Sequence, residues 1–221
     1  MKERAAVSWS GGKDSTFALY KMLKANNYQI DSLLTTITEE VNRISIHGVR
    51  ESLLEKQAAS LNFPLKKIYI PQNSSNEVYQ QRMEEQLIEL KKQGIETVIF
   101  GDILLEDVRA YREELIERQK MKAIFPLWGQ STDGLIKEFL SLGFKTITTC
   151  IDTERLSNKF LGREIDELFI KELPENVDPC GENGEFHTFT FSGPIFKQKI
   201  DFSLGETVEK GRFHFRDLLD C

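Results

Sequence analysis

A short loop near the start of the chain combines glycine, hydroxyl and charged side chains in an order suited to phosphate binding. It lies between an apolar stretch at residues 5–9 and a segment of helical periodicity that begins at Ser15. Adjacent glycines let backbone N–H groups turn toward an anion, and the N-terminus of the following helix adds a partial positive charge. The residues that we expect to bind phosphate are Ser10, Gly11, Gly12, Lys13, Asp14 and Ser15.

The side chains of this loop suit separate tasks on a phosphate group. Ser10 and Ser15 can donate hydroxyl hydrogen bonds, and Lys13 can neutralise charge. Asp14 can cap the helix or hold a magnesium ion. The loop is not a Walker A motif, because Val7 stands where that motif requires glycine, and it is not the G-x-G-x-x-G dinucleotide fingerprint. A plain glycine turn with a capping serine is the alternative.

A second polar group follows the apolar stretch at residues 97–101. Gly101 and Asp102 come where a parallel strand would end, so we expect them beside the phosphate loop, in contact with a bound nucleotide. Arg109 and Arg112 are three apart on a predicted helix, where they share a face and can clamp a phosphate or carboxylate of the substrate. The alternative is a solvent-exposed face on which these arginines mix with neighbouring glutamates.

An acidic glycine-rich loop at residues 178–188 is the other concentration of reactive side chains. Glu182 and Glu185 can bind magnesium, orient an amine or accept its proton, and His187 can act as an acid or a base. Thr188 adds a hydroxyl that can contact a substrate. We predict catalytic roles for the two glutamates and His187, with substrate binding by the glutamates and Thr188. An ordinary acidic turn is the alternative.

Two isolated residues also carry reactive side chains. His47 precedes a predicted helix, where it can reach a nucleotide or serve as a surface or capping residue. Cys180 is a candidate nucleophile, but Cys150 and Cys221 are not spaced to resolve a persulfide or disulfide. We therefore expect Cys180 to pack rather than react.

Short apolar stretches alternate with longer segments of helical period, which is the pattern of a parallel sheet with helical crossovers. Right-handed crossovers bring the carboxyl ends of such strands to one edge of the sheet, where a ligand would bind. We therefore expect an α/β fold with helices on both faces of a parallel sheet. The expected strands are residues 5–9, 32–38, 67–70, 97–101, 123–126 and 146–151.

The pattern changes after about residue 152. A short helix is expected at residues 165–173, followed by the acidic loop and then by phenylalanine-rich sequence of β type. We place a nucleotide-binding domain at residues 1–150 and a smaller β-containing subdomain, which carries the acidic loop, at residues 151–221.

The composition argues against several other classes of protein. The chain has 221 residues, 40% hydrophobic and 29% charged, with a net charge of −6, which fits one folded core and gives no field that attracts nucleic acid. No apolar run reaches the roughly 20 residues that span a bilayer, and the start enters a strand without a signal-peptide segment. We expect a cytoplasmic protein that binds neither membranes nor nucleic acids in general.

Taken in order, these motifs resemble the diphthine-ammonia ligase family, and the likeness spans nearly the whole chain. The acidic Gly-Glu-x-Gly-Glu-Phe loop is characteristic of that family, whereas the phosphate loop is similar to that of the N-type ATP pyrophosphatases, which cut ATP between its α- and β-phosphates. The resemblance implies a HUP-like core of the adenine nucleotide alpha hydrolase type. The matching segments are residues 10–15, 46–48, 126–129, 181–188 and 192–196.

The resemblance implies an amide synthesis. ATP, with Mg²⁺, would adenylate the carboxylate of diphthine on elongation factor 2, and ammonia would displace AMP. Asp14 would then be a catalytic residue as well as a magnesium ligand, and the ATP site would include His47, Gly101 and Asp102. Glu182 and Glu185 would favour ammonia or bind the cationic group of the modified side chain. The oligomeric state stays open, with a homodimer as one option.

One segment departs from the family pattern. Residues 106–113 replace a Tyr-Gln-Arg-x-Arg stretch common in archaeal and eukaryotic members, so the chain looks like a bacterial-type branch. Bacteria are not expected to make diphthamide, and in such a branch the acceptor would be another carboxylate, such as a small metabolite. The alternatives are a pyrophosphate-loop enzyme that modifies RNA and a sensor that binds ATP without turnover.

Overall fold

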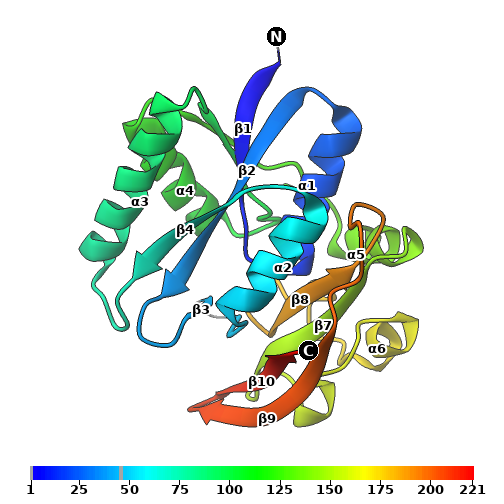
Figure 1. Cartoon of the computed structure of the whole chain (residues 1–221). Helices are drawn as coiled ribbons and strands as arrows, with labels where there is room; N and C mark the ends of the chain where they lie inside the picture. The colour runs from blue at the N-terminus through cyan, green and yellow to red at the C-terminus, as the bar shows by residue number, and fades with distance from the viewer. Residues whose placement is uncertain (1, 45–46) are drawn as a thin grey trace.

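The computed structural model describes residues 2–44 and 47–221 and forms two β-sheets with helices around them (Figure 1). In the first sheet β2 pairs with β1 and β4, β1 with β5, and β5 with β6, all in parallel. The two-residue strand β3 joins the end of β2 in antiparallel orientation. The strands are β1 (Glu3–Ser8), β2 (Tyr28–Thr38), β3 (Arg43–Ile44), β4 (Leu65–Ile70), β5 (Thr97–Ile99) and β6 (Lys122–Ile124).

Helices cover both faces of this sheet, as expected from the sequence (Figure 1). Phe17 of α1 and Leu53 of α2 belong to the core on one face. Leu87 of α3 and Ile116 of α4 belong to a separate core on the other. Each helix buries one apolar stripe because its apolar residues recur at intervals of three and four. The helices are α1 (Lys13–Ala25), α2 (Glu51–Leu61), α3 (Asn76–Lys92) and α4 (Glu106–Arg118).

The second sheet is antiparallel throughout, in the order β8-β7-β10-β9. It contains β7 (Lys145–Asp152), β8 (Phe186–Ser192), β9 (Phe202–Lys210) and β10 (Phe213–Asp220). The expectation that residues 146–151 form a sixth parallel strand is therefore wrong. All but the first residue of β7 are buried, which is the pattern of a strand inside a parallel sheet, and burial alone does not reveal the direction of the partner strands. The other elements are α5 (Thr132–Ser141), the 3₁₀ helix η1 (Asn158–Phe160) and α6 (Glu167–Glu172).

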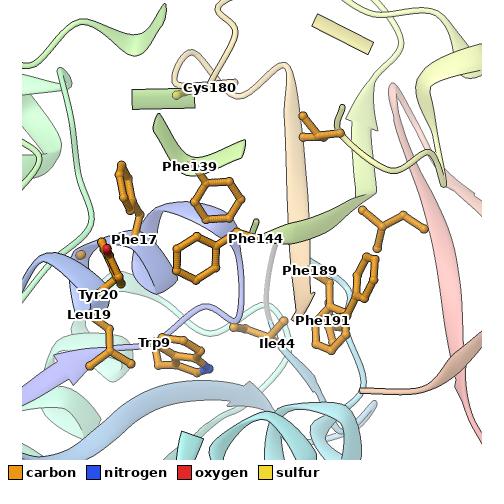
Figure 2. Packing of buried hydrophobic residues seen from close by; sticks show 14 of the residues in the cluster. Trp9, Phe17, Leu19, Tyr20, Ile44, Phe139, Phe144, Cys180, Phe189 and Phe191 are labelled. Carbon is orange, nitrogen blue, oxygen red and sulfur yellow. The ribbon is translucent and has the colours of Figure 1, made fainter. Parts of the chain in front are cut away.

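An aromatic cluster joins the two sheets into one core. Phe17 of α1 meets Phe139 of α5 edge to face, with ring centroids 5.6 Å apart, and Phe139 stacks on Phe144 at 4.6 Å (Figure 2). Tyr20 contacts Phe144 from the side. Such pairs add to the free energy of burial only in defined geometries, so they fix α1, and the loop before it, against the second sheet.

Within residues 2–44 and 47–221, no helix combines the length and the apolar character needed to cross a bilayer.

Candidate active site

A cleft of about 1430 Å³ lies at the carboxyl ends of the parallel strands. On one side its lining includes Ser8, Thr38 and Ile70, the last residues of β1, β2 and β4. On the other side it is lined by the acidic loop and the second sheet. This is the edge at which α/β sheets of this kind bind ligands, because the loops there leave a crevice.

The two glycines of the phosphate loop are required by their surroundings. Gly11 has φ +74, and a Cβ there would lie 2.5 Å from Leu54 Cδ2. A Cβ on Gly12 would lie 2.9 Å from His47 Cε1 and 3.1 Å from the carbonyl oxygen of Thr188. The loop is therefore pressed between α2, His47 and β8, and only glycine fits at both positions.

The two serines of the loop face the cleft and bond to the loop itself. Ser10 Oγ lies 3.2 Å from Ser15 Oγ and accepts the N–H of Gly12 at 3.2 Å. Ser15 Oγ also donates to the carbonyl of Gly12 at 3.1 Å. Gly12, not Asp14 or a serine, is the N-cap of α1, and this residue has no side chain that could cap the helix. No carboxylate of the loop caps α1, so its N-terminus keeps a partial positive charge for a ligand.

Lys13 and Asp14 form a close ion pair within the cleft. The buried Lys13 Nζ lies 2.7 and 2.8 Å from the two carboxylate oxygens of Asp14. Burial alone would lower the pKa of Lys13, but the charges of Asp14 and Glu182 outweigh it and raise that pKa, so Lys13 stays a cation. Burial raises the pKa of Asp14 although Lys13 opposes the change. One third of the Asp14 side chain (34%) is exposed, toward the cleft.

Strand β8 is joined to the phosphate loop by hydrogen bonds that the sequence analysis missed. Thr188 Oγ1 accepts the N–H of Lys13 at 3.0 Å, and the N–H of Thr190 bonds to the carbonyl of Gly11 at 2.9 Å. The buried amide of Gln57 donates to the carbonyls of Gly11 and Thr190 at 2.9 and 2.5 Å. The signal for Gln57 was available, because a glutamine falls on the apolar stripe of α2.

His47 and His187 form a buried pair beside the loop. Their ring centroids are 4.8 Å apart, and His47 Nδ1 lies 3.0 Å from the carbonyl oxygen of Thr188. Burial, helped by the charge of Lys13, lowers the pKa of His47 to about 4 and that of His187 well below its usual value. Both rings are therefore neutral near pH 7. A carbonyl only accepts, so Nδ1 of His47 carries the proton and its Nε2 is an acceptor.

Glu182 brings the acidic loop to the carboxyl edge of the first sheet. Its Oε2 accepts the N–H groups of Ile103 and Leu104 at 3.3 and 3.1 Å, and its side chain lines the cleft. Burial raises the pKa of Glu182 to about 7, helped by the charge of Asp14. A group of this pKa can take up or release a proton at neutral pH.

Glu185 lies behind the acidic loop. It is 1% exposed, and its carboxylate accepts the N–H of Asp178 at 3.1 Å and both nitrogens of Asn183 at 2.9 and 3.0 Å. It is absent from the cleft lining, whereas Asn183 and Glu182 are part of it. These bonds favour a role for Glu185 in shaping the loop that presents Glu182.

The two arginines of α4 diverge. Arg112 lines the cleft, 2.7 Å from Asp102 Oδ2. Arg109 is outside the lining; it pairs with Glu113 at 2.8 Å and stacks over Trp128, 4.6 Å from the ring centroid. They do not form one clamp, because each has its own carboxylate partner. Arg112 and Asp102 stay candidates for ligand binding, and Arg109 fits the alternative of a helix face carrying paired charges.

Cys180 is buried at the cleft and donates its thiol to the carbonyl of Thr132 at 3.4 Å. Burial raises its pKa to about 12. The thiolate is the reactive form of cysteine, so this geometry suits packing better than nucleophilic attack.

Beyond the histidines, one face of the second sheet forms the floor of the cleft. His187 of β8 pairs with Cys150 of β7, and Cys150 with Phe215 of β10, so the three lie in one row. All three line the cleft. Side chains alternate between the faces of a strand, so the next residues of this face are two positions further along.

The next row along this face leads to a group of four charged residues and one phenylalanine at the outer end of the cleft. We call these residues the outer group: Asp152, Arg155, Lys210, Arg212 and Phe213. Asp152 is 2% exposed and pairs in the ladder with Phe213. Its Oδ2 lies 3.7 and 3.5 Å from the Nε atoms of Arg155 and Arg212, which are about half exposed. The sequence analysis missed the outer group because its members lie in two distant segments.

The parallel sheet, the glycine loop after β1 and the cleft above it define a HUP-like, nucleotide-binding type of α/β protein. Residues 3–123 match the family model of the diphthamide synthase N-terminal domain, and residues 131–218 match that of the diphthamide synthase C-terminal domain. The chain belongs to the diphthamide synthase family, as the motif resemblance indicated.

Similar proteins include diphthine–ammonia ligases from several eukaryotes. The Mus musculus protein is 27% identical, with 93% of this chain and 85% of that protein covered. The Danio rerio protein is 28% identical, with 90% and 86% covered. The Schizosaccharomyces pombe protein is 27% identical over 90% of this chain, which corresponds to only 36% of that longer protein.

Proposed function

We propose that this chain is an ATP-dependent, AMP-forming ligase that adenylates a carboxylate and transfers its acyl group to ammonia. The names of its relatives make diphthine on elongation factor 2 the first acceptor to consider, with a related carboxylate as the alternative. One observation carries the proposal: a single cleft holds both the phosphate loop and Glu182 of the acidic loop.

In this proposal the triphosphate of ATP lies on residues 10–15. The α1 N-terminus and the hydroxyls of Ser10 and Ser15 would bind its oxygens. Asp14 fits a magnesium ion bound together with ATP, because such an ion needs only one or two carboxylates besides the phosphates and Asp14 is partly exposed to the cleft. Bound magnesium would make pyrophosphate a better leaving group.

The nucleoside of ATP would occupy the apolar part of the cleft at the ends of β2, β4 and β5. Tyr79, Met83 and Phe100 line this part, next to the Asp102–Arg112 ion pair. Apolar and aromatic walls with a few polar groups suit a flat base and its ribose.

The chemistry would proceed in two displacements. A carboxylate oxygen of the acceptor attacks the α-phosphorus of ATP, and the bond to pyrophosphate breaks. The nitrogen of ammonia then attacks the acyl carbon, the acyl–oxygen bond breaks, AMP leaves, and the nitrogen loses a proton. We assign that proton to Glu182, because its pKa of about 7 lets it accept a proton at neutral pH.

Because His47 and His187 are neutral, they would contact the ligand through hydrogen bonds and would not neutralise its negative charge. His47 presents Nε2 as an acceptor to a hydroxyl or amine of a ligand, because its Nδ1–H is used by Thr188. The acceptor would lie along the floor formed by the second sheet, with its outer portion at Arg155 and Arg212, and its carboxylate would point toward the phosphate loop.

The test uses ATP labelled at the α-phosphate, with magnesium, ammonium and diphthine-bearing elongation factor 2. Acceptor-dependent release of labelled AMP is expected. Release of ADP alone would refute adenylation, and tight ATP binding without turnover on any carboxylate would favour the ATP-sensor alternative. Asp14→Ala should abolish AMP formation through weaker ATP binding, whereas Glu182→Gln should spare ATP binding.

A further inference from the structure

The segment that carries His47 is closed at its base like a hairpin. The N–H of Ile44 bonds to the carbonyl of Val49 at 2.9 Å, and Arg43 forms an antiparallel bridge with Arg50. His47 comes directly before Gly48, and its ring lies against the phosphate loop, where a Cβ on Gly12 would lie 2.9 Å from Cε1 of His47. We call the described residues 42–44 and 47–51 together the His47 hairpin.

The two arginines at the base of the His47 hairpin converge on one carboxylate. Arg43 Nη1 donates to Asp217 Oδ1 at 2.7 Å, while Arg50 donates to both oxygens, through Nε at 3.1 Å and Nη2 at 2.7 Å. The same Nη1 of Arg43 also donates to the carbonyl of Gly48 at 2.8 Å, next to His47. Without Asp217 the two guanidinium groups would face each other uncompensated.

Asp217 belongs to β10, far from the hairpin in sequence, and its strand meets the hairpin a second time. A Cβ on Gly48 would lie 2.7 Å from Cδ1 of Phe215, so that ring packs directly on the hairpin backbone. A bulge in the β9–β10 ladder falls at Asp217, between Arg216 and Leu218. Bulges re-aim side chains and often occur beside active sites.

We infer that Asp217 is a positioning residue for the ATP site, which holds the His47 hairpin through Arg43 and Arg50 so that His47 stays packed on the phosphate loop. Only the naming of ATP rests on the proposed function. Asp217 is 13% exposed and serves two arginines with three hydrogen bonds, which separates it from the many single ion pairs on the surface. The effect of Asp217 on the position of His47 can be measured even if ATP is not the ligand.

The test is a histidine titration by NMR on the full chain, which has three histidines. In the native protein His47 should titrate near pH 4, because it is buried. In Asp217→Asn the hairpin should loosen, and the titration of His47 should move up by about one pH unit or more, toward the value near 6.5 of a solvated ring. His214, bonded to Asn158 away from the cleft, is the internal reference for an intact fold.

Asp220→Asn is the matched control. Asp220 lies on the same strand, pairs with Lys56 of α2 at 3.0 Å and accepts a hydrogen bond from Ser52; it acts on Arg50 through its charge but makes no hydrogen bond to the hairpin residues that the structure describes. A titration of His47 that stays unchanged in Asp217→Asn, or that moves equally in Asp220→Asn, would overturn the inference. If Asp217→Asn does not fold, Arg43→Gln removes the same ion pair from the hairpin side. An unchanged His47 titration in Arg43→Gln, or an equal change in Asp220→Asn, would then overturn the inference.

A second measurement connects the hairpin to the ligand. The Kd for ATP should rise about tenfold in Asp217→Asn and stay unchanged in Asp220→Asn. Native protein that binds no ATP would contradict the proposed function alone, and the NMR result would still decide the inference.

Discussion

Glu182 shows at the scale of one residue how the fold makes a reactive group. The acidic loop carries this carboxylate into a part of the cleft where burial and the charge of Asp14 raise its pKa to about 7. Two backbone N–H groups, from Ile103 and Leu104, keep it in place. A carboxylate that is costly to ionise can take up a proton that an exposed glutamate would refuse.

Glu182→Gln should therefore lower the activity and, at pH values above about 7, raise the stability of the folded protein. The amide still accepts the two N–H groups but cannot take a proton, so AMP formation with ammonium should fall by about a hundredfold or more. Because the folded pKa lies above the ordinary value, the native protein binds more protons between about pH 4.5 and 7, and its stability falls as the pH rises through that window. Urea unfolding should find the variant stabilised more at pH 8 than at pH 5. An equal change at both pH values would contradict this account.

Gly101 is a second single-residue requirement, set by close approach. A Cβ there would lie 2.8 to 2.9 Å from backbone atoms of Asp14 and Ser15, which cannot move without displacing the phosphate loop. Gly101→Ala should weaken ATP binding by about tenfold or more. It should also lower the free energy of unfolding by about 1 to 3 kcal/mol.

Gly134→Ala provides the comparison for Gly101→Ala. Gly134 lies in α5, and among the residues that the structure describes a Cβ there would meet only Ser131, at 3.7 Å or more. Alanine is the better helix former, so this variant should be as stable as the native chain or more so. A loss of ATP binding in Gly134→Ala as well would point to a general effect rather than to the phosphate loop.

At the scale of elements, Gln57 ties α2, the phosphate loop and β8 into one unit. Its amide nitrogen bonds to Gly11 and Thr190, while its oxygen accepts the indole N–H of Trp9 at 3.1 Å. All of these partners are buried, so their polar atoms have no access to water if the amide is lost. The position of the loop thus depends on a helix that contributes none of the expected ATP ligands.

Gln57→Leu should keep the volume and remove the bonds. Leaving the Trp9 N–H and the Thr190 carbonyl without Gln57 should cost about 2 to 4 kcal/mol of unfolding free energy, measured in urea. Gln81→Leu, on the exposed side of α3, removes only a surface bond to Glu85 and should change stability by less than about 0.5 kcal/mol. Similar losses in both variants would rule out the buried network as the cause.

Elements were predictable from the sequence where the evidence was local. Apolar runs next to glycine loops placed β1 and β5, and three-and-four spacing placed α1 and α3, because these patterns depend only on neighbours in the chain. The direction of β7 was not predictable, since its partners β8 and β10 follow much later. The same limit explains Gln57 and the outer group, whose partners are set by tertiary contacts.

The candidate site divides in the same way. Four of residues 10–15, together with Gly101 and Glu182, line the cleft, and the sequence could name them as candidates because loop composition after a strand points to the ligand edge. Glu185 and Arg109 have the same residue types as Glu182 and Arg112, yet their side chains point away from the cleft. Residue type and spacing name candidates, whereas side-chain direction is decided by packing.

At the scale of the whole molecule, two sheets of different type meet along one cleft. The parallel sheet contributes the loop and helix N-terminus that suit phosphate, and the antiparallel sheet contributes the floor and the outer group. The aromatic cluster around Phe17 and Phe139 fixes one sheet against the other. If ATP and acceptor occupy opposite sides of the cleft, their binding should be separable by mutation.

The last prediction tests that division with steady-state kinetics. Arg212→Gln, at the outer end of the cleft, should raise the KM for diphthine-bearing elongation factor 2 by about tenfold and leave the KM for ATP within about twofold, because uniform binding energy is lost on one substrate only. Asp102→Asn, beside Arg112, should raise the KM for ATP by about tenfold and leave the KM for diphthine-bearing elongation factor 2 within about twofold. Lys199→Gln, which removes an exposed charge outside the cleft, should alter neither constant. If Arg212→Gln raised both KM values together, the two sheets would not serve separate substrates, and the acceptor would have to bind beside ATP on the parallel sheet.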